Sequence, residues 1–114
     1  MRNINSLRKG SLFKEVYKKG KSRANTYLVM YVLPAEGETR IGLSVSKKVG
    51  NSVVRHRIAR LLRECYLAYK EDLPQGYHLV VVARYTCKGA GLSELKEAFG
   101  QLLNMHKLVT GRNS

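Results

Sequence analysis

The chain of 114 residues has no tryptophan, two prolines, two cysteines and eight acidic residues. Cys65 and Cys87 stand alone, without CxxC or Cys/His spacing, so they do not indicate a disulfide framework or a zinc module. No apolar run reaches the 18 residues that a membrane-spanning helix needs. The acids form no pair at a spacing typical of a metal site or an acid–base couple.

Positive charge is what the sequence has in excess. Its 21 Lys and Arg residues outweigh the eight acids and give a net charge of +13, which favours nucleic acid or an anionic membrane surface as partner. Residues 1–23 hold eight of the cations against one Glu, and residues 47–63 hold six against none. Such clustering indicates a binding surface, although an ordinary solvated basic face is the alternative.

The segment after Asn51 has a clear helical period. Its apolar residues recur at helical spacing and predict one buried stripe: Val54, Ile58, Leu61, Leu62, Cys65 and Tyr69. His56, Arg60 and Arg63 would then project from the opposite side, while Arg55 and Arg57 flank the stripe. A helix fixed to a core by one face, with cations on the other, is suited to bind a polyanion.

The other segments alternate between helix and strand. The predicted helices cover residues 11–19, 52–69 and a final segment capped by Ser93, and the predicted strands cover residues 26–33, 40–46 and 77–84. Asn51 or Ser52 would cap the second helix, and Gly20 would end the first.

This order, α-β-β-α-β-α, predicts a two-layer α/β (α+β) sandwich with a mixed sheet. We expect residues 26–33 and 40–46 to pair antiparallel, and residues 40–46 and 77–84 to be parallel neighbours, with 79–83 as a buried central strand. The whole chain, residues 1–114, would be a single RNA-binding domain with flexible ends at 1–6 and 110–114.

Aromatic residues supply a second candidate feature. Phe13 and Tyr17 are four residues apart on the first helix, beside Lys14, and Tyr31 lies on the first predicted strand. Core packing and a stacking platform for single-stranded RNA both explain this set, and the sequence leaves the two open.

Catalytic groups of the chain's own are not expected. The three histidines are scattered, Ser44 and Ser46 have no nearby base, and the single glycine of the Val49–Ser52 loop is too weak a signal for a phosphate loop. Since the N-terminal residues also lack a signal-peptide core, we expect a soluble, cytoplasmic protein with no membrane partner.

Three blocks of the sequence resemble the bacterial ribonuclease P protein subunit. The most specific is Lys47-Lys48-Val49-Gly50-Asn51, followed by Val54-Arg55-His56-Arg57-Ile58 and Arg60-Leu61-Leu62-Arg63-Glu64. Gly42-Leu43-Ser44-Val45-Ser46 precedes it, and Phe13-Lys14-Glu15-Val16-Tyr17-Lys18-Lys19-Gly20 belongs to the same pattern. One departure is His56, because the family usually has Asn between the two arginines.

The resemblance implies a ribosomal protein S5 domain 2-like fold with a left-handed βαβ crossover. It also implies a subunit of an endoribonuclease whose catalytic RNA, using magnesium, cleaves precursor tRNA to leave the mature 5′ end. The protein would be monomeric apart from this ribonucleoprotein and would hold no catalytic residue and no metal ligand.

Two sets of contacts follow from the resemblance. The residues expected to bind the RNA subunit are Lys47, Lys48, Asn51, Arg55, His56, Arg57, Arg60 and Arg63. Those expected to bind the precursor's 5′ leader are Phe13, Lys14, Tyr17 and Tyr31. A ribosomal or other structural RNA-binding protein, or a stand-alone nucleic-acid enzyme, are the alternatives that the charge alone allows.

Overall fold

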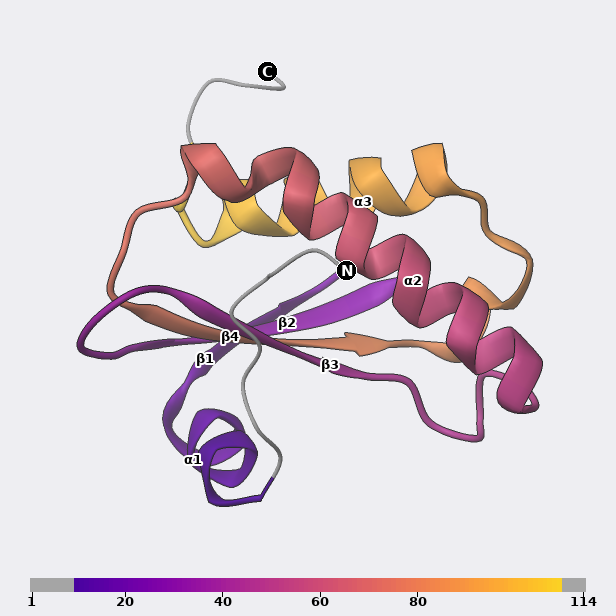
Figure 1. Cartoon of the computed structure of the whole chain (residues 1–114), viewed down its shortest axis with the longest axis horizontal. Helices are drawn as coiled ribbons and strands as arrows, with labels where there is room; N and C mark the ends of the chain where they lie inside the picture. The colour runs from indigo at the N-terminus through magenta and orange to yellow at the C-terminus, as the bar shows by residue number, and fades with distance from the viewer. Residues whose placement is uncertain (1–9, 110–114) are drawn as a thin grey trace.

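The computed structural model describes residues 10–109, and a four-stranded sheet in the order β1-β2-β4-β3 forms its centre (Figure 1). The strands are β1 (Lys21–Ala24), β2 (Leu28–Pro34), β3 (Arg40–Ser44) and β4 (Tyr77–Ala83). Because β4 runs antiparallel to β2 and parallel to β3, the sheet is mixed. The parallel pairing of β3 with β4, and the central place of β4, confirm the sequence predictions.

The predicted antiparallel pairing of residues 26–33 with 40–46 is wrong, because β4 lies between β2 and β3. The segment after β2 bonds to the approach to β4 and does not close a hairpin. The Ala35 N–H donates to the Gly76 carbonyl at 2.8 Å, and the Thr39 hydroxyl donates to the Pro74 carbonyl at 2.6 Å. β4 is apolar on both faces, and a place between two strands is what buries such a strand.

The sequence does not predict β1. All four of its residues are exposed and none gives an alternating apolar pattern. It pairs with β2 at the edge of the sheet, with Lys21 opposite Val32 and Ala24 opposite Val29. Charged side chains of this kind protect a sheet edge from pairing with other chains.

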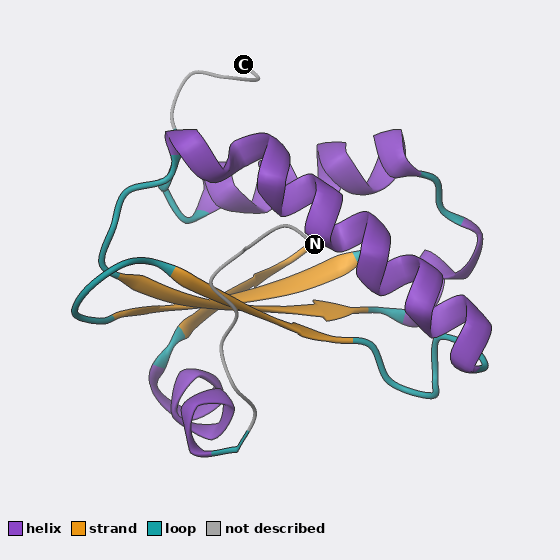
Figure 2. Ribbon diagram, in the orientation of Figure 1, coloured by secondary structure: helices purple, strands orange, loops and turns teal. Residues whose placement is uncertain are grey.

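Helices cover both faces of the sheet. α2 (Ser52–Tyr69) and α3 (Leu92–Met105) lie on one face, and α1 (Ser11–Lys19) lies on the other (Figure 2). Short 3-10 helices, η1 (Lys70–Asp72) and η2 (Tyr85–Gly89), follow α2 and β4. The sheet and the α2–α3 layer are the predicted two-layer sandwich, with α1 added on the second face. No helix within residues 10–109 has the length and apolarity to cross a membrane.

Two of the predicted helix ends agree with the structure, and one does not. The Asn51 Oδ1 accepts the Val54 N–H at 3.0 Å and caps α2, as predicted, and Gly20 ends α1. The predicted Ser93 cap is wrong, since α3 begins at Leu92. The Glu94 carboxylate reaches back to accept the Gly91 N–H at 2.8 Å, and this bond sets the earlier start.

The larger core lies between the sheet and the α2–α3 layer. Its largest fully buried side chains include Tyr66, Phe99, Leu28, Met30, Ile58 and Leu62. A smaller cluster lies under α1 and centres on Val16 and Val80, both 0% exposed. The flexible ends predicted for residues 1–6 and 110–114 lie outside the described residues, as do residues 1–9 of the basic N-terminal segment.

Candidate nucleic-acid interface

The loop between β3 and α2 presents two lysines. Val49 is buried, and its N–H donates to the Ser46 carbonyl at 3.0 Å. The Lys48 N–H donates to the Ser46 hydroxyl at 3.3 Å. This tight turn leaves the side chains of Lys47 and Lys48 exposed just before the N-terminus of α2.

α2 has a buried face and a cationic face. Ile58, Leu62 and Cys65 are buried against the sheet, together with Tyr66, which the predicted stripe does not include. His56, Arg60 and Arg63 are exposed, as the helical period predicts. The helix therefore holds its charges in fixed positions, because the opposite face is anchored in the core.

Two arginines of α2 are held by backbone carbonyls. Both terminal nitrogens of Arg57 donate to the Ala90 carbonyl, at 2.9 and 3.3 Å, which ties α2 to the segment before α3. The Arg55 Nε donates to the Gly50 carbonyl at 3.2 Å. A guanidinium has five N–H donors, so each arginine keeps donors for a phosphate. Holding a side chain before binding lowers the entropy that binding costs.

The loop and the first turns of α2 together form what we call the α2 cationic surface. Its residues are Lys47, Lys48, Asn51, Arg55, His56, Arg57, Arg60 and Arg63. The N-terminus of a helix carries a partial positive charge, which adds to the attraction of this surface for phosphate. Asn51 uses its Oδ1 as the helix cap, so its amide NH₂ is the group that can meet RNA.

An aromatic surface lies on the opposite face of the sheet, beside α1. We define it as Phe13, Lys14, Tyr17 and Tyr31. The Tyr17 ring meets the Tyr31 ring edge-on at 4.9 Å and an angle of 82°, and the Phe13 and Tyr17 rings lie 6.2 Å apart at 68°. The structure thus brings together all three predicted aromatic residues.

Glycine on β3 makes room for Phe13. A Cβ atom on Gly42 would lie 2.4 Å from the end of the Phe13 ring, so any other residue would displace that ring. Phe13 and Tyr31 are half-buried against the Val16–Val80 cluster, while Tyr17 is 39% exposed and Lys14 is exposed. The two roles that the sequence left open, core packing and a stacking platform, fall to different residues: Phe13 packs against the core, and Tyr17 has an exposed ring.

The two predicted sets of residues do not form one site. α1 and α2 lie on opposite faces of the sheet, so the sheet separates the helix that carries Phe13, Lys14 and Tyr17 from the helix that carries most of the α2 cationic surface (Figure 1).

Among the described residues, the two buried cysteines and the half-buried His78 do not form a reactive centre. Burial raises the pKa of Cys65 to about 12 and also raises the pKa of Cys87. Burial lowers the pKa of His78, and Arg40 lowers it further. Within residues 10–109, no three His, Cys, Asp or Glu side chains come together in a way that could hold a metal ion.

Tyr85 is an exposed aromatic residue that the sequence analysis missed. It lies on η2 and is 69% exposed, and the segment that follows η2 supplies the Ala90 carbonyl bound by Arg57. The signal that could have found it is an aromatic residue next to Arg84 and close to Lys88.

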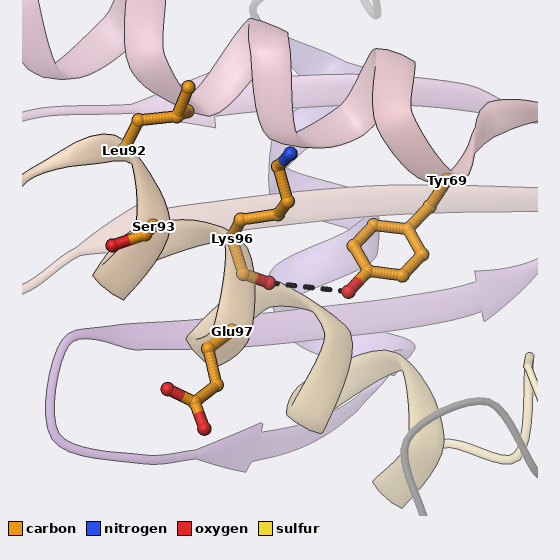
Figure 3. A pocket seen from close by; sticks show the side chains of 5 residues that line it. All are labelled: Tyr69, Leu92, Ser93, Lys96 and Glu97. Carbon is orange, nitrogen blue, oxygen red and sulfur yellow. Dashed lines mark hydrogen bonds between the residues drawn. The ribbon is translucent and has the colours of Figure 1, made fainter.

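A pocket between α2 and α3 contains none of the predicted site residues. It has a volume of about 380 Å³ and is lined by Tyr69, Leu92, Ser93, Lys96 and Glu97 (Figure 3). The Tyr69 hydroxyl donates to the Lys96 carbonyl at 3.4 Å, and the Tyr69 ring stacks on Phe99 with centroids 6.1 Å apart. These contacts join the end of α2 to α3.

Comparison with known proteins identifies the family. The family model described as Ribonuclease P matches residues 1–107. The chain belongs to the ribonuclease P protein family. The ribonuclease P protein component of Lachnoclostridium phytofermentans is 50% identical over 106 residues, which cover 92% of this chain and 91% of that protein. The component from Alkaliphilus oremlandii is 46% identical over 110 residues and covers 96% of each chain.

Solved structures agree with this assignment. The ribonuclease P protein of Staphylococcus aureus superposes with a TM-score of 0.86 at 30% identity, covering 95% of this chain and 100% of that one. The protein from Thermotoga maritima gives a TM-score of 0.78 at 28% identity, covering 93% and 98%. The mixed-sheet α/β fold is thus shared with these proteins, and the handedness of the β3–α2–β4 connection stays a prediction.

Membership defines the general role of the chain. It is the protein subunit of ribonuclease P, a tRNA-processing ribonucleoprotein with endoribonuclease activity, and its partner is the ribonuclease P RNA.

Proposed function

We propose that the chain assists RNA-catalysed removal of the 5′ leader from precursor tRNA by binding two RNA segments on opposite faces of its sheet. The α2 cationic surface would contact the RNA subunit, and the aromatic surface would hold the leader. The observation that carries this proposal is the cluster of Phe13, Tyr17 and Tyr31 on the face opposite α2.

The cationic contact would work by neutralising phosphates. Each phosphate contacted by Lys or Arg adds about 0.7–0.9 to the slope of log K against log salt. Arg60 and Arg63 project freely into solvent, whereas Arg55 and Arg57 are held by carbonyls. The first pair suits flexible contacts with phosphates, and the second pair suits a fixed geometry. His56, in the position where the family usually has Asn, can also donate to RNA.

The leader contact would work by stacking. Base–aromatic stacking is worth about 1–3 kcal/mol per base and accepts any base, which suits a leader whose sequence differs between precursors. Tyr17 has the exposed ring, and Lys14 is an exposed cation on the same helix for the leader's phosphates.

The chemistry of cleavage belongs, in this proposal, to the RNA subunit. No three His, Cys, Asp or Glu side chains that could hold a metal ion gather among residues 10–109. Magnesium would be bound mainly by the RNA. We further propose that residues 1–114 act as one RNA-binding domain, that the protein is monomeric outside the ribonucleoprotein, and that it acts in the cytoplasm.

The test is cleavage of precursor tRNA at low magnesium by the protein alone, by the RNA subunit alone, and by both together. We expect leader removal only in the combined reaction, because the cations of the protein screen repulsion between RNA backbones. Cleavage by the protein alone would indicate a stand-alone nuclease. Binding to the RNA subunit without any gain in cleavage would indicate a structural RNA-binding protein.

A further inference from the structure

A pocket lined by two lysines lies at the end of the sheet that is farther from the N-terminus of α2. It has a volume of about 260 Å³, and Lys19, Lys21, Tyr77 and His106 are among its lining residues. Val32 and Pro34 add an apolar wall. No predicted RNA-binding residue lines it, so it is separate from the α2 cationic surface and the aromatic surface.

The end of α3 forms one side of this pocket. Lys107 adopts a left-handed conformation with φ of 62°, which turns the chain back so that buried Leu108 can donate its N–H to the Leu103 carbonyl at 2.9 Å. The His106 Nε2 donates to the Met30 carbonyl at 2.9 Å, which fixes its ring against β2.

Three carbonyl groups near the end of α3 are already hydrogen-bonded: Leu103 accepts from Leu108, and two others accept from the residues that follow the helix. Those of Leu102 and Asn104 accept backbone N–H groups from His106 and Lys107, at 3.0 and 2.9 Å. Because these carbonyl oxygens already accept hydrogen bonds, the C-terminal end of α3 has fewer free carbonyl oxygens that could repel an anion.

Positive charge gathers around the pocket. Lys21 and Arg23 alternate with Ser22 along β1, so they lie on the same face of the strand. Their register partners on β2 are Val32 and Met30. Burial lowers the pKa of His106, and the charges of Arg23 and Lys21 lower it further. The hydrogen bond to the Met30 carbonyl acts in the other direction and raises this pKa, but by less than burial lowers it.

Glu15 is close to the pocket. Glu15 lies 3.6 Å from the Lys19 Nζ, but the two side chains are 46% and 62% exposed. An ion pair with that much solvent around it contributes little, so Lys19 remains able to bind a phosphate.

We propose that this pocket binds one nucleotide of single-stranded RNA, with its phosphate between Lys19 and Lys21 and its base against Pro34 and Tyr77. A pocket of about 260 Å³ is smaller than ordinary small-molecule sites of about 300–1,000 Å³, and it therefore suits one unit of a longer chain. The inference rests on the proposed function, which supplies a single-stranded RNA.

The pocket is close in the chain to the aromatic surface. Lys19 follows Tyr17 on α1 by two residues, and Ser22, next to Lys21, is the register partner of Tyr31. An RNA strand that leaves the aromatic surface around the end of β1 would reach the pocket, which makes it a second contact for the same leader.

The first test measures the salt dependence of binding between the full chain and a labelled single-stranded RNA. We expect Lys21→Gln to lower the slope of log K against log salt by about 0.7, the value for one phosphate of a single strand. Lys21 is exposed, so this variant should fold normally. Lys96→Gln removes the same charge from an exposed position on α3 and should leave the slope within error of the parent's. Equal slopes for all three proteins would overturn the proposal.

The second test identifies the ligand. We would follow the ring signals of His106 and Tyr77 by NMR while adding adenosine monophosphate, inorganic phosphate or adenosine. The proposal requires that adenosine monophosphate shift these signals more than inorganic phosphate or adenosine does. It also requires that the Lys21→Gln variant lose the shifts caused by the nucleotide. Equal shifts with inorganic phosphate would mean an anion site only, and no shift with the nucleotide would mean no site; either result contradicts the proposal.

These results can be separated from those that test the proposed function. If the pocket is not used, Lys21→Gln behaves as the parent while the parent still stimulates leader removal. If the proposed function is wrong, the parent protein gives no stimulation at all.

Discussion

Replacing Gly42 by alanine tests how the aromatic surface is built. The new Cβ would lie 2.4 and 2.6 Å from two atoms at the end of the Phe13 ring, and 3.2 Å from a third. Ordinary contact begins at 3.4 Å, so the ring would have to move by about 1 Å. Because Phe13 packs on the buried Val16–Val80 cluster, the ring is not free to move without loss of packing.

The expected cost of Gly42→Ala is about 1–3 kcal/mol in the free energy of unfolding, the usual range for overpacking. Leucine at position 13 has no atoms at the end of a ring, so Gly42→Ala should cost less than about 0.5 kcal/mol in a Phe13→Leu background. The two substitutions should therefore be coupled by at least about 1 kcal/mol. The variant should also bind precursor tRNA less tightly than the parent does.

Urea denaturation of the four proteins of this double-mutant cycle measures the coupling. Gly89→Ala is the matched control, since a Cβ there meets no atom within 4 Å, and its effect should add to that of Phe13→Leu. If the costs of Gly42→Ala and Phe13→Leu simply add, the Phe13 ring does not lie against Gly42 and the geometry of the aromatic surface is wrong.

Three further predictions concern other parts of the molecule. Arg57→Ala removes both hydrogen bonds to the Ala90 carbonyl, so urea denaturation should show a loss of about 1–2 kcal/mol; it should also weaken binding to the RNA subunit, and Arg57→Lys should restore part of that binding. An Ala variant as stable as the parent would contradict this. His106 has a pKa below its ordinary value of 6.5, so the unfolded chain binds the proton more readily. The stability that His106 contributes is present above pH 6.5 and falls as the pH drops through the lowered pKa; His106→Gln should flatten this fall, and an unchanged profile would refute it. Burial raises the pKa of Cys65 to about 12, so a thiol reagent at pH 8 should modify Cys65 only at the rate of unfolding; fast modification of the native protein would show that the thiol is accessible.

Local features of the fold could be predicted from the sequence. α2 begins and ends where the Asn51 cap and the apolar period indicate, because both signals come from residues within a few turns. The same holds for Phe13 and Tyr17, which one helical turn brings together. The strand at 77–83 is recognisable because both of its faces are apolar.

Features that depend on long-range pairing could not be predicted. An apolar pattern indicates a strand but not its neighbour, so the pairing of β2 with β4, in place of the predicted pairing of β2 with β3, was missed. β1 has no apolar pattern at all, and only its bonds to β2 make it a strand. The need for glycine opposite Phe13, and the pocket that Lys19 and His106 both line, arise from residues far apart in the chain.

The most direct test of two separate RNA surfaces compares Tyr17→Ala with Arg60→Ala in the reconstituted ribonucleoprotein. Both residues are exposed, so both variants should fold. A binding titration of each variant gives two quantities: the affinity of the holoenzyme for precursor tRNA relative to mature tRNA, and the affinity of the protein for the RNA subunit. We predict that Tyr17→Ala lowers the precursor-to-mature ratio without changing assembly, and that Arg60→Ala weakens assembly without changing the ratio. If either variant changes both quantities to the same extent, the two surfaces are not separate and the account is contradicted.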